Sequence, residues 1–150
     1  YIISFTYIDS KQNEKDKNAR NTAKVLLRTT YQECKETFNL LDNKEILAKY
    51  IIPKIDFNKI ENKLDTNLQS MPFNSYELVM NLSASGYITE KEIETYLCIK
   101  KEFQGLVKMK ITFFDLEKSK TEEHKALRDE INRRSQNLLD TLNFEIQNRL

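Results

Sequence analysis

The stretch NARNTAKVLLRTTYQECKETFNLL, residues 18–41, carries an apolar or small side chain at every third or fourth position along one face. The steps between these positions are four, four, four, three, four and three, the spacing of one face of an α-helix. Lysine, arginine, glutamine and glutamate occupy the opposite face. The stretch predicts a long helix that buries a single stripe, consisting of Ala19, Ala23, Leu27, Tyr31, Cys34, Phe38 and Leu41.

Two further stretches predict long amphipathic helices. Thr89 and Glu92 have the separation of a capping box, in which each side chain bonds the other residue's backbone at a helix start. The apolar positions after it are Ile93, Tyr96 or Leu97, Phe103, Val107, Ile111 and Phe114. Ser119 and Glu122 repeat the spacing before the last helix. Its apolar positions are Leu127, Ile131, Leu138, Leu142, Ile146 and Leu150.

Shorter helices are predicted between the long ones. Capping-box spacing at 42–45 predicts a helix that ends before Pro53, because proline disfavours helix at the preceding residue. A second piece begins at Asp56. The same spacing at 74–77 predicts a helix that ends at Gly86, where glycine can take the left-handed conformation of a helix terminus.

These patterns predict an all-α fold, an irregular bundle of three long amphipathic helices plus shorter helices. The chain has only two glycines and two prolines, whereas the tight turns of β-sheets usually need these residues. A length of 150 residues fits one domain, so we expect residues 1–150 to form a single helical domain. Inside the second long helix, Gly105 is expected to permit the close approach of another helix.

Charge and cysteine content narrow the classes of partner. The chain has 24 basic and 23 acidic residues, and this balance disfavours nucleic-acid binding, which usually needs a clear positive excess. The only candidates for a basic face are Arg20, Lys24, Arg28, Arg133 and Arg134. The two cysteines at 34 and 98 have no metal-site spacing, and we expect both to be reduced core residues in a reducing compartment.

The sequence excludes several kinds of active site. Two glycines 19 residues apart cannot form a dinucleotide-binding or P-loop motif. A single histidine, His124, excludes sites that need two histidine ligands, and we expect it to be solvated in the first turn of the last helix. We therefore predict no catalytic, cofactor-binding or metal-binding residues, no cofactor and no enzymatic activity.

Residues 81–92 have the skeleton of an EF-hand calcium loop. Gly86 is at the sixth place, Ile88 at the eighth and Glu92 at the twelfth, but Glu92 is the only carboxylate among the ligand positions. The same residues fit a plain helix–turn–helix, in which Gly86 ends one helix and Thr89 with Glu92 caps the next. The capping interpretation is favoured, and the calcium interpretation stays open.

The first residues have a composition of their own. Residues 1–8 are apolar and aromatic, and residues 9–28 carry six basic and three acidic side chains. An apolar segment with a basic flank is typical of the cytoplasmic end of a membrane-spanning helix, although eight residues cannot span a bilayer. We therefore keep two interpretations of residues 1–10: the end of a membrane anchor N-terminal to Tyr1, or a strap that packs on the core.

A resemblance agrees with the anchor interpretation. The segments Asn74–Val79 and Gly86–Ile88, with Phe103, Phe113 and Phe114, resemble a pattern in small bacterial proteins that have one membrane-spanning helix and a cytoplasmic helical domain. The resemblance implies no activity. The favoured hypothesis is a non-enzymatic protein-interaction domain of a bacterial membrane protein, on the cytoplasmic side of the membrane if anchored and otherwise cytoplasmic. The alternative is a soluble regulatory binding module that uses the turn at 81–92; the sequence identifies neither a protein partner nor an oligomeric state.

Overall fold

The computed structural model describes residues 2–51, 67–114 and 122–150, and within these ranges every regular element is helical. The all-α prediction is confirmed. Three long helices dominate the molecule: α1 (Ile2–Asp42), α5 (Glu90–Thr112) and α6 (Glu122–Asn148). The helix start predicted at Asp56 and the predicted capping residue Ser119 lie outside the described residues.

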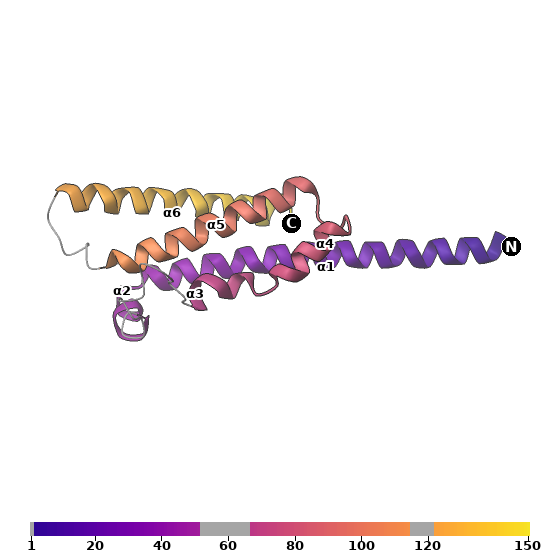
Figure 1. Cartoon of the computed structure of the whole chain (residues 1–150), viewed down its shortest axis with the longest axis horizontal. Coiled ribbons are helices and arrows are strands. Elements are labelled where there is room, and N and C mark those ends of the chain that lie inside the picture. Colours follow the sequence, from indigo (N-terminus) through magenta and orange to yellow (C-terminus); the bar gives the residue numbers. More distant parts are fainter. Residues whose placement is uncertain (1, 52–66, 115–121) are drawn as a thin grey trace.

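The long helices pack as a bundle around the C-terminal half of α1. Figure 1 shows α5 and α6 side by side along this half, and the short elements that precede α5 in the chain pack against α1 and α5. The N-terminal half of α1 extends past the other elements (Figure 1). We predicted that this helix begins at Asn18, which was wrong, because α1 begins at Ile2. The backbone of residues 2–10 thus continues the helix away from the core.

Five short elements complete the described fold. After α1 come α2 (Lys44–Ile46) and a π-helical turn, η1 (Leu47–Ile51). Before α5 come α3 (Asn67–Ser70), a 3₁₀ turn, η4 (Met71–Phe73), and α4 (Tyr76–Ala84). The helix predicted from residue 42 is therefore divided between α2 and η1.

Two of the predicted helix caps were misplaced. The residue that caps α2 is Asn43, whose side-chain oxygen accepts the backbone N–H of Ile46 at 3.2 Å, and Asp42 is the last residue of α1. At α4 the preceding residue is Ser75, whose side chain makes no capping hydrogen bond, so the predicted capping box at 74–77 is absent. Spacing alone does not distinguish which polar residue of a cluster leaves the helical conformation.

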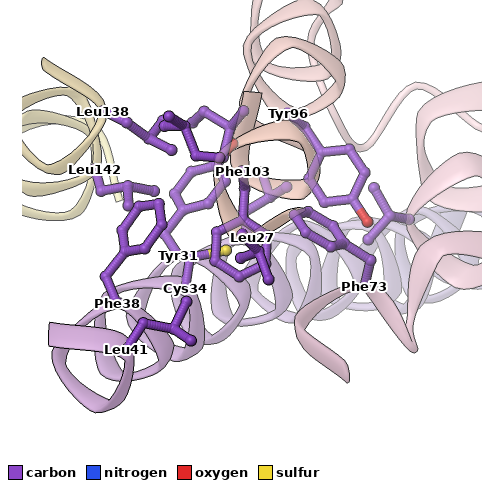
Figure 2. Packing of buried hydrophobic residues seen from close by; sticks show 14 of the residues in the cluster. Leu27, Tyr31, Cys34, Phe38, Leu41, Phe73, Tyr96, Phe103, Leu138 and Leu142 are labelled. Carbon is purple, nitrogen blue, oxygen red and sulfur yellow. The ribbon is translucent and has the colours of Figure 1, made fainter. Parts of the chain in front are cut away.

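The core combines one stripe from each long helix. From α1 it takes the predicted positions except Ala19, which is only partly buried. The buried positions of α5 are Tyr96, Ile99, Phe103, Leu106, Val107 and Ile111. Leu138 and Leu142 supply the α6 side of the cluster (Figure 2). The sequence left either Tyr96 or Leu97 as the core position of α5. Tyr96 is the buried residue, whereas Leu97 is 39% exposed.

An aromatic cluster lies at the centre of this core. The ring of Phe103 is 5.2 Å from that of Phe38 and 5.7 Å from that of Phe73, measured between centroids. Phe73 also meets the edge of Tyr96 at 5.7 Å. Figure 2 shows these side chains converging from α1, η4 and α5. Tilted and edge-to-face rings at such distances stabilise a core beyond the burial of their area.

Two predictions about the second long helix were wrong. Cys34 is buried, but Cys98 is exposed, since the buried neighbours Tyr96 and Ile99 turn residue 98 toward solvent. Both cysteines are free thiols. Gly105 does not permit a close helix approach, because a Cβ atom added there would meet no atom within 4 Å.

Candidate interaction sites

The turn between α4 and α5 is built as the capping interpretation predicts. Gly86 has a φ of 84°, a left-handed conformation that favours glycine. The N–H of Gly86 donates to the carbonyl of Ser83, and the N–H of Tyr87 donates to that of Leu82, at 3.0 and 2.9 Å. This pair of bonds is the Schellman motif, which satisfies the carbonyls at the end of a helix.

The start of α5 is closed by the predicted capping box. The backbone N–H of Glu92 donates to Oγ1 of Thr89 at 3.1 Å, and the N–H of Thr89 donates to Oε1 of Glu92 at 2.9 Å. Ile88 between the two helices is buried. Whether this turn could bind a cation therefore depends on the other contacts of the Glu92 carboxylate.

Arg20 of α1 binds that carboxylate. Its Nη1 donates to Oε1 of Glu92 at 2.6 Å and its Nη2 donates to Oε2 at 3.0 Å. Nη1 also donates to the carbonyl oxygen of Tyr87 at 2.8 Å. Both carboxylate oxygens are thus hydrogen-bonded within the protein. An EF-hand needs the same pair of oxygens for its cation, so this geometry supports the capping interpretation of residues 81–92.

The ion pair perturbs the acidity of Glu92. Burial raises the pKa of this carboxyl, but the hydrogen bonds from Arg20 and Thr89 and the charge of Arg20 together hold it below its usual value. A lowered pKa means that the charged form is the one stabilised by folding. In the described ranges, 2–51, 67–114 and 122–150, no group of three or more His, Cys, Asp or Glu side chains could hold a metal ion.

A second contact joins α1 to the same turn. The hydroxyl of Tyr87 donates to Oδ1 of Asp16 at 2.7 Å, and Gln12 donates to the same oxygen at 3.0 Å. Sequence reasoning placed Arg20 on the solvated face of α1 and assigned no role to Asp16. No local pattern indicates either partnership, because the paired residues are 71 and 72 positions apart.

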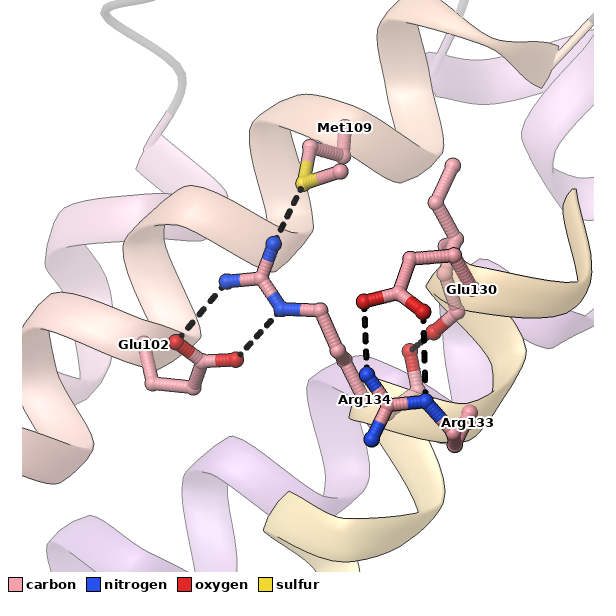
Figure 3. A network of polar contacts seen from close by, with 7 residues as sticks. Glu102, Met109, Glu130, Arg133 and Arg134 are labelled. Carbon is pink, nitrogen blue, oxygen red and sulfur yellow. Dashed lines mark hydrogen bonds and ion pairs between the residues drawn. The ribbon is translucent and has the colours of Figure 1, made fainter. Parts of the chain in front are cut away.

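The arginines considered as a basic face are partly engaged elsewhere. Arg134 of α6 donates to both oxygens of Glu102 on α5, at 3.0 and 2.9 Å, and to the sulfur of Met109 (Figure 3). Arg133 lies on the exposed side and pairs with Glu130 on its own helix (Figure 3). Together with Arg20, three of the five candidates contact carboxylates.

A small pocket lies where the end of α1 meets α2, α5 and α6. Its volume is about 80 Å³, and its apolar wall includes Leu41, Leu47, Phe114 and Ile131. Its polar rim consists of Asp42, Lys44, Lys110 and Arg128. Lys110 donates to Oδ1 of Asp42 at 2.7 Å, and its ammonium lies 5.2 Å from the ring centre of Phe38. Among the described residues that line the pocket, three are basic and one is acidic.

The remaining sequence candidates contribute no common site. His124 lies in the first turn of α6 and is partly exposed, whereas we expected a solvated position. Cys98 is on the outer side of α5. None of the helices in the described part of the chain combines the length and the apolar content that crossing a membrane requires.

Comparisons with known proteins identify no relative. No family model, no curated protein and no solved structure matches this chain. The resemblance to helical domains of bacterial membrane proteins therefore stays a prediction. The function has to be argued from the contacts and charges of the molecule itself.

Proposed function

We propose that this chain is a non-enzymatic protein-interaction domain whose contact element is the projecting N-terminal half of α1. The supporting observation is the way α1 divides into two parts. Its C-terminal half carries the core stripe, and its first part continues as helix beyond the bundle (Figure 1).

The part of α1 from residue 10 to residue 18 has the character of a spacer. Residues 10–15, 17 and 18 are all polar and exposed, and Asp16 reaches Tyr87 at the edge of the bundle. A helix that is polar on every side bridges solvent between two packed regions, provided that side-chain pairs support it. Gln12 and Asp16 form such a pair, four residues apart. The spacer therefore separates the bundle from a partner that binds residues 2–8.

The segment beyond the spacer has the composition of a contact surface. Residues 1–8 include Ile2, Ile3, Phe5, Tyr7 and Ile8. At 1.5 Å per residue, the helix carries Ile8 about 12 Å beyond Asp16. Burial of apolar side chains contributes roughly 25 cal/mol per Å², so a segment of this composition gains stability when a partner covers it. An interaction role also agrees with the single histidine and two glycines, which exclude several enzyme classes.

Photo-crosslinking in the native cell tests this proposal. A benzophenone amino acid replaces Tyr7 in one variant and Phe144, an exposed aromatic residue of α6, in a control variant. We expect a discrete protein adduct from position 7 and none from position 144. The double variant Ile3→Asp/Ile8→Asp should abolish the adduct while the melting temperature of the bundle changes little, since both residues precede the core stripe.

Amide hydrogen exchange provides a second, independent test of the proposed contact element. In the purified chain, amides of residues 2–12 should exchange much faster than those of residues 23–41, because the first part of α1 extends past the other elements whereas residues 23–41 carry the core stripe. The crosslinked complex should protect residues 2–8. Equal adduct yields from positions 7 and 144, or an adduct that survives Ile3→Asp/Ile8→Asp, would contradict the proposal.

A further inference from the structure

We infer that Asp16 and Arg20 form a latch between α1 and the turn that joins α4 to α5, and that this latch sets the direction in which the contact element leaves the bundle. The latch consists of Asp16, Arg20, Tyr87 and Glu92. Figure 1 shows the turn at the end of the bundle from which the first part of α1 projects. The inference rests on the proposed function for the role of residues 2–8, whereas the latch itself is a feature of the bundle.

The latch residues of α1 continue the face that carries the core stripe. This face consists of Asp16, Arg20, Ala23 and Leu27. The steps are four, three and four, so these side chains lie on one side of the helix. Ala23 and Leu27 are buried, whereas no side chain among residues 10–22 is buried. At positions 16 and 20 the face therefore makes polar contacts in place of apolar burial.

The turn provides fixed partners for both residues. Gly86 has its left-handed conformation, and Ile88 is buried beneath the turn. The capping box of Thr89 and Glu92 closes the start of α5. Tyr87 lies between Gly86 and Ile88, so both latch partners belong to this hydrogen-bonded segment. Each of these local bonds joins residues of the turn itself, and the turn therefore keeps its shape when α1 moves.

The two contacts of the latch differ in strength. Arg20 donates to both oxygens of Glu92, at 2.6 and 3.0 Å, and to the carbonyl oxygen of Tyr87 at 2.8 Å. Asp16, about 6 Å further along the helix, accepts one hydrogen bond from the Tyr87 hydroxyl at 2.7 Å. The outer contact at Asp16 therefore opens before the inner one. Opening exposes no buried side chain of residues 10–22, so it does not require the core to unfold.

The state of the latch determines how the contact element meets a partner. Residues 2–18 belong to the same continuous helix as Arg20. While the latch is closed, this part of α1 keeps one direction relative to the bundle. When the latch opens, the segment loses two tertiary contacts, and helix segments without tertiary packing are marginally stable. Because a preorganised element loses less freedom on binding, the closed latch strengthens the interaction that residues 2–8 make.

Distance measurements between two spin labels test the latch. Nitroxides are attached to Asn13→Cys in the spacer and to the native Cys98, both at exposed positions, while Cys34 is buried. Double electron–electron resonance should give a narrow distance distribution when the latch is intact. Arg20→Met/Tyr87→Phe removes both side-chain contacts, and methionine matches arginine in helix propensity. We expect this variant to give a clearly broader distribution, because the released helix samples several directions.

A matched variant separates the latch from a general loss of stability. Arg133→Met/Tyr76→Phe makes the same residue changes outside the latch, where Arg133 pairs with Glu130 and the Tyr76 ring stacks on Tyr96. It should leave the distance distribution unchanged. Circular dichroism and thermal melting confirm that each variant is folded.

A single substitution tests the outer contact without any change in the sequence of α1. In Tyr87→Phe, the amides of residues 13–18 should exchange up to about tenfold faster than in the wild type, the size expected for the loss of one hydrogen bond. If Arg20→Met/Tyr87→Phe does not fold, Tyr87→Phe alone decides the question, through this exchange rate and through a broader distance distribution.

Three results would overturn the inference. The first is a distribution in Arg20→Met/Tyr87→Phe as narrow as that of the intact latch, which would show that α1 keeps its direction by itself. The second is equal broadening in Arg133→Met/Tyr76→Phe, and the third is unchanged exchange of residues 13–18 in Tyr87→Phe. All of these measurements use the purified full chain without a partner, so their failure is distinguishable from a failure of the crosslinking test.

Discussion

Arg20 and Glu92, 72 positions apart in the chain, form a two-pronged ion pair that joins α1 to the start of α5. Glu92 is only 12% exposed on its side chain and also completes the capping box of α5. One carboxylate therefore supports both a local structure and a long-range contact. The contact lies where the spacer of α1 enters the bundle.

Removal of Arg20 should destabilise the fold measurably. Arg20→Met leaves a mostly buried carboxylate without its charged donor, and hydrogen bonds to charged groups contribute roughly 1.5–3 kcal/mol. We expect urea denaturation to show a loss of about 2 kcal/mol in the free energy of unfolding. A double-mutant cycle with Glu92→Gln, which retains a side chain able to form the capping box, should give a coupling energy of about 1 kcal/mol.

The matched control for Arg20 is Arg133, whose pair with Glu130 is exposed and within one helix. Arg133→Met should leave the free energy of unfolding nearly unchanged, because exposed ion pairs contribute little to stability. Equal effects of the two substitutions would refute the structural role assigned to the Arg20–Glu92 pair.

The contribution of Glu92 should depend on pH in the acidic range. Its pKa in the folded chain lies below the usual value, so folding favours the charged form. The resulting stability is present above the unfolded pKa of about 4.3 and is lost as the pH falls through the lower folded value. The stability difference between wild type and Glu92→Gln should therefore be full at pH 7 and smaller at pH 3. A difference that is constant across this range would contradict the lowered pKa.

The two glycines should respond to alanine substitution with opposite signs. Gly86→Ala forces a left-handed conformation on a residue with a Cβ atom, which costs about 1–2 kcal/mol. Gly105→Ala adds a Cβ into open space within a helix, which should stabilise the fold by up to about 1 kcal/mol. Thermal melting of both variants checks this. A loss of stability in Gly105→Ala would indicate that another helix approaches residue 105 closely, which would contradict the structure.

The two cysteines should differ in reactivity. Burial, with a smaller contribution from the charge of Glu33, raises the pKa of the Cys34 thiol, and the thiol is 0% exposed. Iodoacetamide at pH 8 should therefore modify Cys98 in the folded chain and reach Cys34 only after unfolding, because the thiolate is the reactive form. Mass spectrometry should count one adduct on the native protein and two in guanidinium. The Cys98→Ser variant should give none until it unfolds.

Tyr96 should tolerate the loss of its hydroxyl. This group is buried and has no hydrogen-bond partner among the described residues, and burial, with a smaller contribution from Tyr76, raises its pKa to about 12. Tyr96→Phe removes an unsatisfied polar atom, so we expect unchanged stability or a gain of up to about 1 kcal/mol. In the control, Tyr87→Phe, the hydroxyl that donates to Asp16 is lost, and stability should fall measurably.

Much of the helical framework was predictable from spacing. The stripe from Ala23 to Leu41, the termination at Gly86 and the capping box at Thr89 and Glu92 are all observed. Each of these depends on residues within a few positions of one another, where helix geometry alone decides which side chains meet. Spacing failed for the first part of α1, because its polar residues carry no apolar period to mark a helix.

The wrong predictions of buried positions in α5 and of the cap of α2 have a common origin. Cys98 and Leu97 are apolar residues beside a true core position, and only the direction in which α5 meets α1 decides that Tyr96 and Ile99 are buried instead. Similarly, Asp42 and Asn43 are both plausible caps, and the structure assigns the cap to Asn43 while Asp42 pairs with Lys110. Neighbouring residues differ by about 100° around a helix, so small differences in packing direction choose between them.

The sequence by itself determined that this chain is all-α, where its main apolar stripes lie and how α5 begins, because these features depend on local hydrogen bonds and on a period of 3.6 residues. Only the tertiary structure decided that Arg20 holds Glu92, that Lys110 and Arg128 share the rim of one pocket, and that α1 extends beyond the bundle (Figure 1). These relationships join residues far apart in the chain. They depend on how the helices are placed in three dimensions, and no short-range pattern encodes that placement.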